Sequence, residues 1–141
     1  MNFDRWVFVE FLCDLLLDEN QPITERFRAF SLRLIGSHPS AINSFIKAMR
    51  DDSTLLAYEA AYRLGRTRKS DAIHALKAVV EDFSLHPIVS VKAVESLGAF
   101  GLETSILVLQ TSFQSDPSPE VRDTCEVALT QIRELKKCHS Q

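Results

Sequence analysis

The chain has 141 residues, of which 45% are hydrophobic and 25% are charged, and its formal net charge at pH 7 is −3. This length and composition suit one globular domain with a continuous core and exclude a disordered chain. The slightly acidic balance also disfavours nucleic-acid binding, which needs a concentrated basic surface. We expect the basic residues within 63–69 to form the solvated last turn of a helix.

The first apolar stretch, residues 1–17, is interrupted by Asp4, Glu10 and Asp14, and no basic segment precedes it. It therefore fits neither a signal peptide nor a membrane span, and we expect no contact with a membrane. An amphipathic helix fits better, with a carboxylate stripe opposite an apolar stripe. The apolar stripe consists of Phe8, Leu12, Leu15 and Leu16.

Apolar spacing and turn residues predict four helices in the first half of the chain. We expect them at about residues 3–18, 23–36, 41–49 and 54–64. Thr24 and Ser53 are candidate N-caps of the second and fourth helices, because a hydroxyl there can accept a hydrogen bond from a free backbone N–H.

Four further helices are expected in the second half, at about residues 71–80, from 87 to a closing stretch at 98–101, at 106–113 and at 120–137. Ser70 or Asp71 is the candidate cap of the fifth, and Pro87 lies in the first turn of the sixth. The apolar stripe of the seventh includes Leu107 and Phe113. Residues 1–137 are thus expected to form one domain, followed by a disordered tail at 138–141.

Two of these helices repeat one pattern, LAYEAAYRLG at residues 56–65 and VSVKAVESLG at residues 89–98. In each, an apolar residue is followed four positions later by Ala and eight later by Leu, which places all three on one helix stripe. The closing glycines, Gly65 and Gly98, are expected helix stops. The frame recurs around Ala29 and Cys125, so the repeats are spaced by 31, 33 and 32 residues. A fixed period of this size predicts a helical solenoid.

The segment VRDTCEVAL, residues 121–129, resembles the V-R-x-x-A-x-x-A-L pattern of HEAT repeats. The resemblance implies an all-α solenoid of about four helical hairpins, or about eight helices. The second helices of the hairpins would then line the concave side.

Longer stretches are similar to deoxyhypusine hydroxylase. They are DDSTLL at 51–56, EAAYRLG at 59–65, HPIV at 86–89, ESLGA at 95–99, DP at 116–117 and TCE at 124–126, with QPITERFRAFSLR at 21–33. The similarity runs in order from about residue 20 to 136. It covers half the length of a member of that family, because the full-length protein is a tandem of two four-repeat halves.

The resemblance implies a non-haem di-iron monooxygenase that hydroxylates the modified lysine, deoxyhypusine, of one translation factor. That family holds iron through His-Glu dipeptides, two in each half. At the two matching places this chain has Tyr58-Glu59 and Val91-Lys92, so only Glu59 retains a usual iron donor. We therefore predict no di-iron centre, no cofactor and no catalytic residue in this chain alone.

The candidate groove residues are Glu59, Tyr62, Lys92 and Glu95. Glu59 is either a solvated relic carboxylate or part of an acidic patch with Glu95, and Tyr62 is either a groove rim or core packing. Lys92 is expected to pair with Glu95, three residues on. The four histidines share no metal-ligand spacing, and no nucleophile or phosphate-loop motif is present.

Three hypotheses follow. The leading one is a non-catalytic, cytoplasmic HEAT-repeat module, a pseudoenzyme whose concave groove binds a protein or peptide, with the hypusine-containing translation factor as the inherited partner. The second is a deoxyhypusine monooxygenase whose iron site is completed by another chain. The third is a degenerate copy without a defined role. Three scattered cysteines favour a reducing compartment, and the pattern leaves the oligomeric state open.

Overall fold

The computed structural model of the protein describes residues 3–31 and 38–140. Within these ranges the chain forms eight α-helices and two 3₁₀ helices, and no strand. The helices are α1 (Phe3–Leu17), α2 (Ile23–Phe27), η1 (Arg28–Ser31), α3 (Pro39–Ala48), α4 (Thr54–Gly65), α5 (Ser70–Glu81), α6 (Pro87–Phe100), η3 (Glu103–Ser105), α7 (Ile106–Ser115) and α8 (Pro119–Ser140). The fold class predicted from the repeat period, an all-α solenoid, is confirmed.

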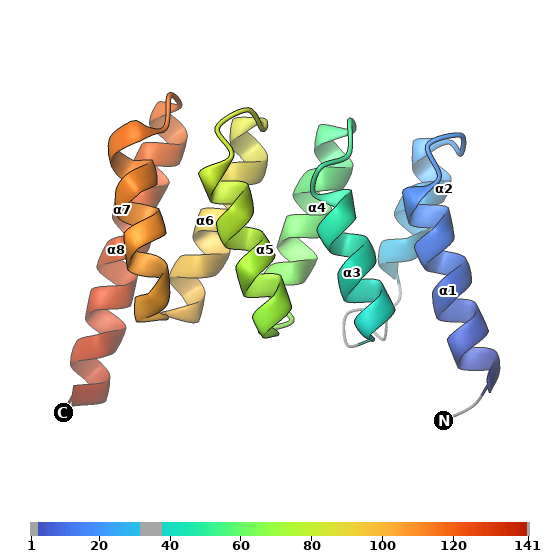
Figure 1. Cartoon of the computed structure of the whole chain (residues 1–141), viewed down its shortest axis with the longest axis horizontal. Coiled ribbons are helices and arrows are strands. Elements are labelled where there is room, and N and C mark those ends of the chain that lie inside the picture. The colour runs from blue at the N-terminus through green and yellow to red at the C-terminus, as the bar shows by residue number, and fades with distance from the viewer. Residues whose placement is uncertain (1–2, 32–37, 141) are drawn as a thin grey trace.

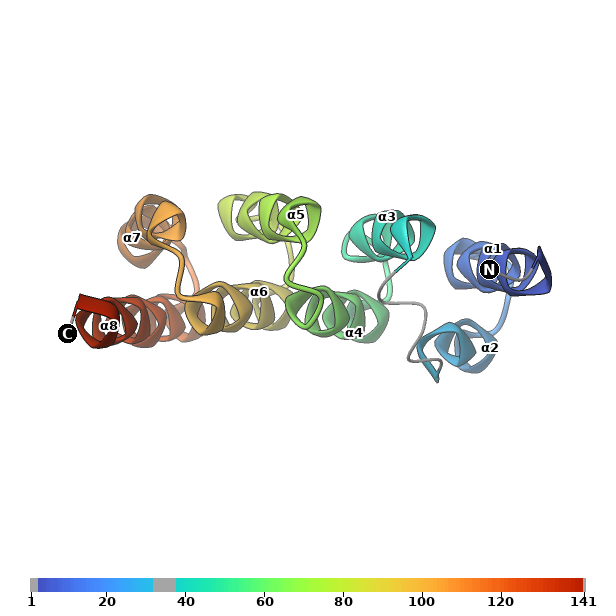
Figure 2. The ribbon, with the colours of Figure 1, turned by 90° about the horizontal axis from the view of Figure 1, so that it is seen from below.

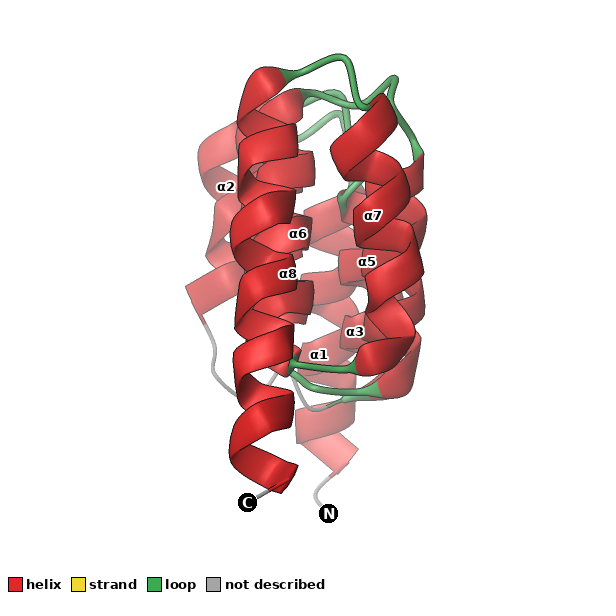
Figure 3. Ribbon diagram, turned by 90° about the vertical axis from the view of Figure 1, so that its left-hand side faces the viewer, coloured by secondary structure: helices red, strands yellow, loops and turns green. Residues whose placement is uncertain are grey.

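The helices pair into four hairpins that stack side by side in chain order (Figure 1). The first helices, α1, α3, α5 and α7, form one layer, and α2, α4, α6 and α8 form the other (Figure 2). Seen end-on, the helices of one layer run roughly antiparallel to those of the other, and the connecting loops lie at the two ends of the helices (Figure 3). In the second layer α4, α6 and α8 pack directly against each other, more extensively than α3, α5 and α7 do.

The repeat frame read from the sequence coincides with the buried spine of the second layer. Ala60, Ala93 and Cys125 are each fully buried, and so are the leucines that follow the two alanines by four positions. Small side chains in mid-stripe let neighbouring helices approach closely, and this close approach is what the pattern encodes.

The sixth helix ends within the predicted closing stretch, Gly98 to Gly101, although Gly98 itself is not the helix stop that its place in the repeat suggested. Helix α6 continues through it to Phe100 and ends at Gly101, whose φ of 70° is the left-handed conformation that glycine adopts without strain. A Cβ on Gly98 would lie 2.8 Å from the Ala128 Cβ and 2.7 Å from the Gln131 Oε1. Gly98 is therefore required by the contact between α6 and α8.

Each hairpin turn is closed by the same device, an aspartate that accepts a hydrogen bond from the backbone N–H two residues on. The distances from Oδ1 to N are 2.9 Å for Asp51 and Ser53, 3.0 Å for Asp82 and Ser84, and 2.9 Å for Asp116 and Ser118. Asp18 makes the corresponding bond to the N–H of Asn20 at 3.0 Å. The turns are therefore built alike, although their sequences differ.

The predicted helix caps are partly correct. Ser53 caps α4 by accepting a hydrogen bond from the N–H of Leu56 at 3.3 Å, and Pro87 is the first residue of α6. Thr24 does not cap α2, because the helix already begins behind Pro22. Helix α5 begins behind Lys69, which makes no side-chain cap, so Ser70 and Asp71 lie inside it.

Ion pairs join successive hairpins at these turns. Arg26 of α2 bonds the carbonyl oxygen of Leu16 at 2.9 Å and pairs with Asp51 in the next hairpin's turn, and its side chain is only 6% exposed. One hairpin further on, Arg50 pairs with Asp82 at 2.6 Å in a more exposed setting. The first of these ion pairs, Arg26 with Asp51, connects the α1–α2 hairpin to the next hairpin.

Three expectations about the ends of the array need correction. Phe8 belongs to the exposed side of α1 and not to its buried stripe, which Leu12 and Leu16 provide, because α1 has a single neighbouring hairpin. Leu107 is likewise 73% exposed on α7, and Phe113 is 39% exposed. Helix α8 continues three residues beyond the predicted Lys137, to Ser140. The expected end of the second helix, Gly36, lies outside the described residues.

None of the helices in the described ranges has the length and apolar character that crossing a lipid bilayer requires.

We predict that Asp51→Asn lowers the free energy of unfolding by about 3 kcal/mol, because it leaves the buried Arg26 guanidinium without its counter-charge. Urea unfolding at pH 7, followed by circular dichroism, measures the effect. Asp82→Asn, at the equivalent but exposed turn, is the matched control and should cost clearly less. Equal losses in the two variants would contradict this assignment.

A second prediction concerns acid. Hydrogen bonds from Ser84 and then from Arg50 lower the pKa of Asp82 from 3.8 to about 2. Because the folded-state pKa lies below the unfolded one, this stabilisation is present above about pH 4 and is lost as the pH falls toward 2. The stability gap between wild type and Asp82→Asn should therefore close between about pH 4 and pH 2. A gap that stays constant across that window would refute the shift.

Candidate functional site

The predicted site residues lie on the exposed side of the layer formed by α4, α6 and α8, which we call the second-helix face. Tyr58, Glu59 and Tyr62 come from α4, and Val91, Lys92 and Glu95 come from α6. Residues three or four apart share a helix side, so Tyr58 with Tyr62, and Lys92 with Glu95, form two facing pairs where α4 meets α6.

Lys92 is the centre of this cluster. Its ammonium lies 2.7 Å from Glu95 Oε2 and lies over two tyrosine rings, 5.2 Å from the Tyr58 ring centroid and 5.5 Å from that of Tyr62. Partial burial by itself would lower the pKa of Lys92, but hydrogen bonds to Glu95 and Tyr58 outweigh it and raise the pKa above its usual value. Lys92 is therefore a cation fixed by contacts with Glu95 and the two tyrosines. The predicted Lys92–Glu95 ion pair is present.

Glu59 is held separately. Arg63, one turn further along α4, donates a hydrogen bond from its Nε to Glu59 Oε1 at 3.0 Å. The guanidinium of Arg63 also lies over the ring of Phe30, 5.9 Å from its centroid. Glu59 and Glu95 are thus each paired with a cation of their own helix.

The side chains at the four implied ligand positions do not fit an iron ion. Val91 is a half-buried aliphatic residue that packs against the core, and the Lys92 ammonium would repel a dication. Glu59 is already paired with Arg63, which leaves Tyr58 as the one further oxygen donor. No group of three or more His, Cys, Asp or Glu side chains with metal-binding geometry occurs in residues 3–31 and 38–140.

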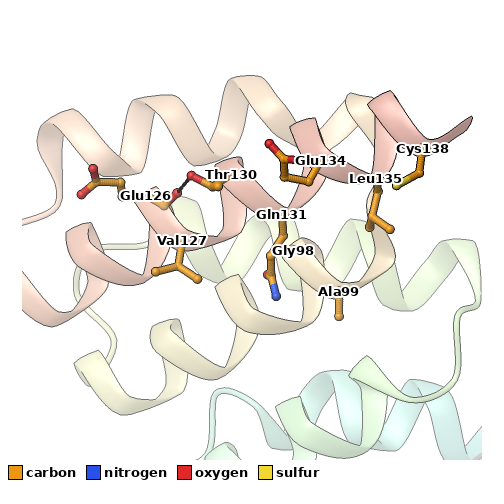
Figure 4. A pocket seen from close by; sticks show the side chains of 9 residues that line it. All are labelled: Gly98, Ala99, Glu126, Val127, Thr130, Gln131, Glu134, Leu135 and Cys138. Atoms are coloured by element: carbon orange, nitrogen blue, oxygen red, sulfur yellow. Dashed lines mark hydrogen bonds between the residues drawn. The ribbon is translucent and has the colours of Figure 1, made fainter. Parts of the chain in front are cut away.

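A groove that the sequence did not indicate lies beside this cluster, between α6 and α8. Its volume is about 670 Å³. The lining is mainly apolar and comes from α6 and α8 alone (Figure 4). The lining residues are Gly98, Ala99, Glu126, Val127, Thr130, Gln131, Glu134, Leu135 and Cys138.

The groove continues the row of positions to which the predicted site belongs. Tyr62 on α4, Glu95 on α6 and Val127 on α8 occupy the same place in successive repeats, at spacings of 33 and 32 residues. Val127 is 60% exposed and lines the groove. Carrying the repeat frame one helix further would have indicated it.

The three cysteines differ in environment. Cys13 and Cys125 are buried, and burial raises the pKa of both thiols, although a nearby serine hydroxyl opposes the shift in each case. Cys138 is exposed and lines the groove. Only this third thiol is placed to report on what enters the groove.

Comparison with known proteins agrees with this architecture. Residues 42–130 match the family model described as HEAT repeats. The chain is 49% identical over 133 residues to deoxyhypusine hydroxylase of Arabidopsis thaliana, and 55% identical over 128 residues to deoxyhypusine hydroxylase-B of Oryza sativa subsp. japonica. These alignments cover 94% and 89% of the chain, but only 42% of each relative.

A solved structure, human deoxyhypusine hydroxylase in complex with glycerol, superposes with a TM-score of 0.83 at 34% sequence identity. The superposition covers 94% of the chain and 46% of that structure. The chain therefore spans less than half the length of the relatives it matches.

We predict that one of the three thiols reacts with a maleimide in the folded protein and that all three react in 6 M guanidinium chloride. The two buried thiols are shielded and have raised pKa values, whereas Cys138 is open to solvent. Intact-mass spectrometry counts the adducts, and Cys138→Ser should abolish native labelling. Two or more fast adducts on the native wild type would contradict the packing of α1 or α8.

Proposed function

The chain belongs to the HEAT-repeat family and is homologous to part of deoxyhypusine hydroxylase, and we propose that it is a non-catalytic module that binds a protein segment on its second-helix face. The single observation that carries this proposal is the side-chain set at the implied ligand positions, Tyr58-Glu59 and Val91-Lys92. Lys92 places a cation where iron binding needs a carboxylate, and Glu59 is paired with Arg63.

The groove between α6 and α8 supports the binding part of the proposal. It is open, mainly apolar and bordered by the carboxylates of Glu126 and Glu134, with Thr130 and Gln131 able to orient a bound backbone. These features suit an extended or helical peptide with an apolar anchor and a basic flank. The hypusine-containing translation factor is the partner that homology suggests first.

We place this binding in the cytoplasm. All three cysteines are free thiols. The two buried ones, Cys13 in α1 and Cys125 in α8, belong to different hairpins and form no disulfide with each other. Unpaired cysteines are usual in a reducing compartment.

The second candidate is deoxyhypusine monooxygenase activity with iron ligands supplied by another chain. The observation that favours it is the identity of 49–55% to proteins that bear the name of this enzyme. It predicts that the purified chain, mixed with a partner that carries intact His-Glu pairs, hydroxylates a deoxyhypusine peptide faster than the partner alone. An unchanged rate would leave the binding module as the better account.

We predict that Val127→Asp weakens binding of the translation factor at least about tenfold, or about 1.4 kcal/mol, because it places an uncompensated carboxylate in the apolar lining. Isothermal titration calorimetry with the lysine and deoxyhypusine forms of the factor measures the affinity. Leu107→Asp is the matched control, since Leu107 is a similarly exposed apolar residue on α7, outside the groove.

If both variants bind like wild type, the groove is not the binding surface. If the wild type binds neither form of the factor, the inherited partner is wrong, and a degenerate copy without this role becomes the better interpretation.

A further inference from the structure

The cluster around Lys92 has the composition of a binding site for an organic cation. Tyr58 and Tyr62, one turn apart on α4, each have their ring within 5.5 Å of the Lys92 ammonium. Glu95 on α6 contributes a carboxylate oxygen 2.7 Å from the same atom. Two aromatic rings and a carboxylate around one ammonium form the arrangement by which proteins bind alkylammonium groups.

We propose that Tyr58, Tyr62 and Glu95 form an alkylammonium-binding cage that the chain fills with its own Lys92. The cage lies where α4 meets α6, apart from the groove between α6 and α8. While Lys92 occupies it, this part of the second-helix face is closed to the lysine side chain of any partner. Lys92 then determines which cations the face accepts, whatever protein binds in the groove.

The surroundings of Lys92 indicate that its ammonium occupies the cage and does not extend into solvent. Its side chain is only 18% exposed, whereas that of its partner Glu95 is 50% exposed. Lysine can bury its aliphatic stem while its ammonium stays in water, so the contacts of the ammonium, and not the exposure of the whole side chain, place it in the site. Besides the ion pair with Glu95, the ammonium contacts the two rings and forms a hydrogen bond with Tyr58.

A second cation holds the cage wall in place. Arg66 donates a hydrogen bond to the Tyr62 hydroxyl at 3.0 Å, and its guanidinium lies 5.7 Å from the centroid of the same ring. Arg66 therefore orients Tyr62 independently of Lys92. The wall should persist when Lys92 is shortened, because Tyr62 keeps this contact and α4 keeps its buried spine.

Lys92→Ala tests the cage because it removes the atoms of one propylammonium ion and keeps the Cβ. We expect n-propylammonium chloride to raise the Tm of this variant saturably, by roughly 3 °C at a fivefold excess over Kd, relative to sodium chloride of equal ionic strength. Wild type should show no such difference, because its cage is filled. Lys92→Met is the matched control, since it fills the same space without a charge and should also show none.

Adding Tyr58→Leu to Lys92→Ala should abolish the response to propylammonium. A folded Lys92→Ala variant that responds equally to propylammonium and sodium, or a wild type that responds as strongly as the variant, would overturn the proposal.

A measurement on the wild type covers the case in which Lys92→Ala does not fold. The Cε protons of Lys92 should resonate upfield of an exposed lysine because of the two ring currents, and Tyr58→Leu should reduce that shift. Cε protons at the position of a solvated lysine would overturn the proposal independently.

Discussion

The close packing of α4, α6 and α8 is the constraint on which the rest of the molecule depends. It is made by side chains that are small or absent: Ala60 and Ala93 at the centres of their stripes, and Gly98 where α6 meets α8. Gly65 has the same role between α4 and α6, since a Cβ there would collide with the hydroxyl of Ser96. Larger residues would separate the helices, and Lys92 would no longer reach the rings of Tyr58 and Tyr62.

The repeat frame gives every functional position a defined place on this layer. Tyr58 and Val91 occupy one such place in successive repeats, and Glu59 and Lys92 occupy the next. Exchanging side chains at these positions changes the chemistry of the surface without disturbing the buried spine one residue away. The fold stays close to that of a solved relative, with a TM-score of 0.83, and the face of this layer carries the cation of Lys92.

Much of the architecture could be predicted because its signals are local. The repeat period follows from Ala60, Ala93 and Cys125, and the start of α6 follows from Pro87, because each is determined by spacing or by one residue's backbone preference. The role of Gly98 could not be predicted from the sequence. A glycine that follows an apolar helix stripe can either end the helix or allow a second helix to pack closely against it. Only the position of Ala128, thirty residues later, decides between them.

The site was predictable at the level of residues but not of contacts. The ion pair of Lys92 with Glu95 follows from helical spacing, whereas its position over the two tyrosine rings depends on the distance between α4 and α6. The groove was missed because its lining has no motif of its own and the repeat frame was not extended from Glu95 to Val127. It exists because α8 extends along α6 to Cys138, beyond the expected end of the core.

The central proposal is that this chain, although it keeps the solenoid, binds no iron of its own. Iron bound by the purified full chain, after anaerobic incubation with Fe(II) and desalting, tests it most directly. The account predicts iron well below one ion per chain, unchanged in Glu59→Gln. Stoichiometric iron that Glu59→Gln removes would contradict it.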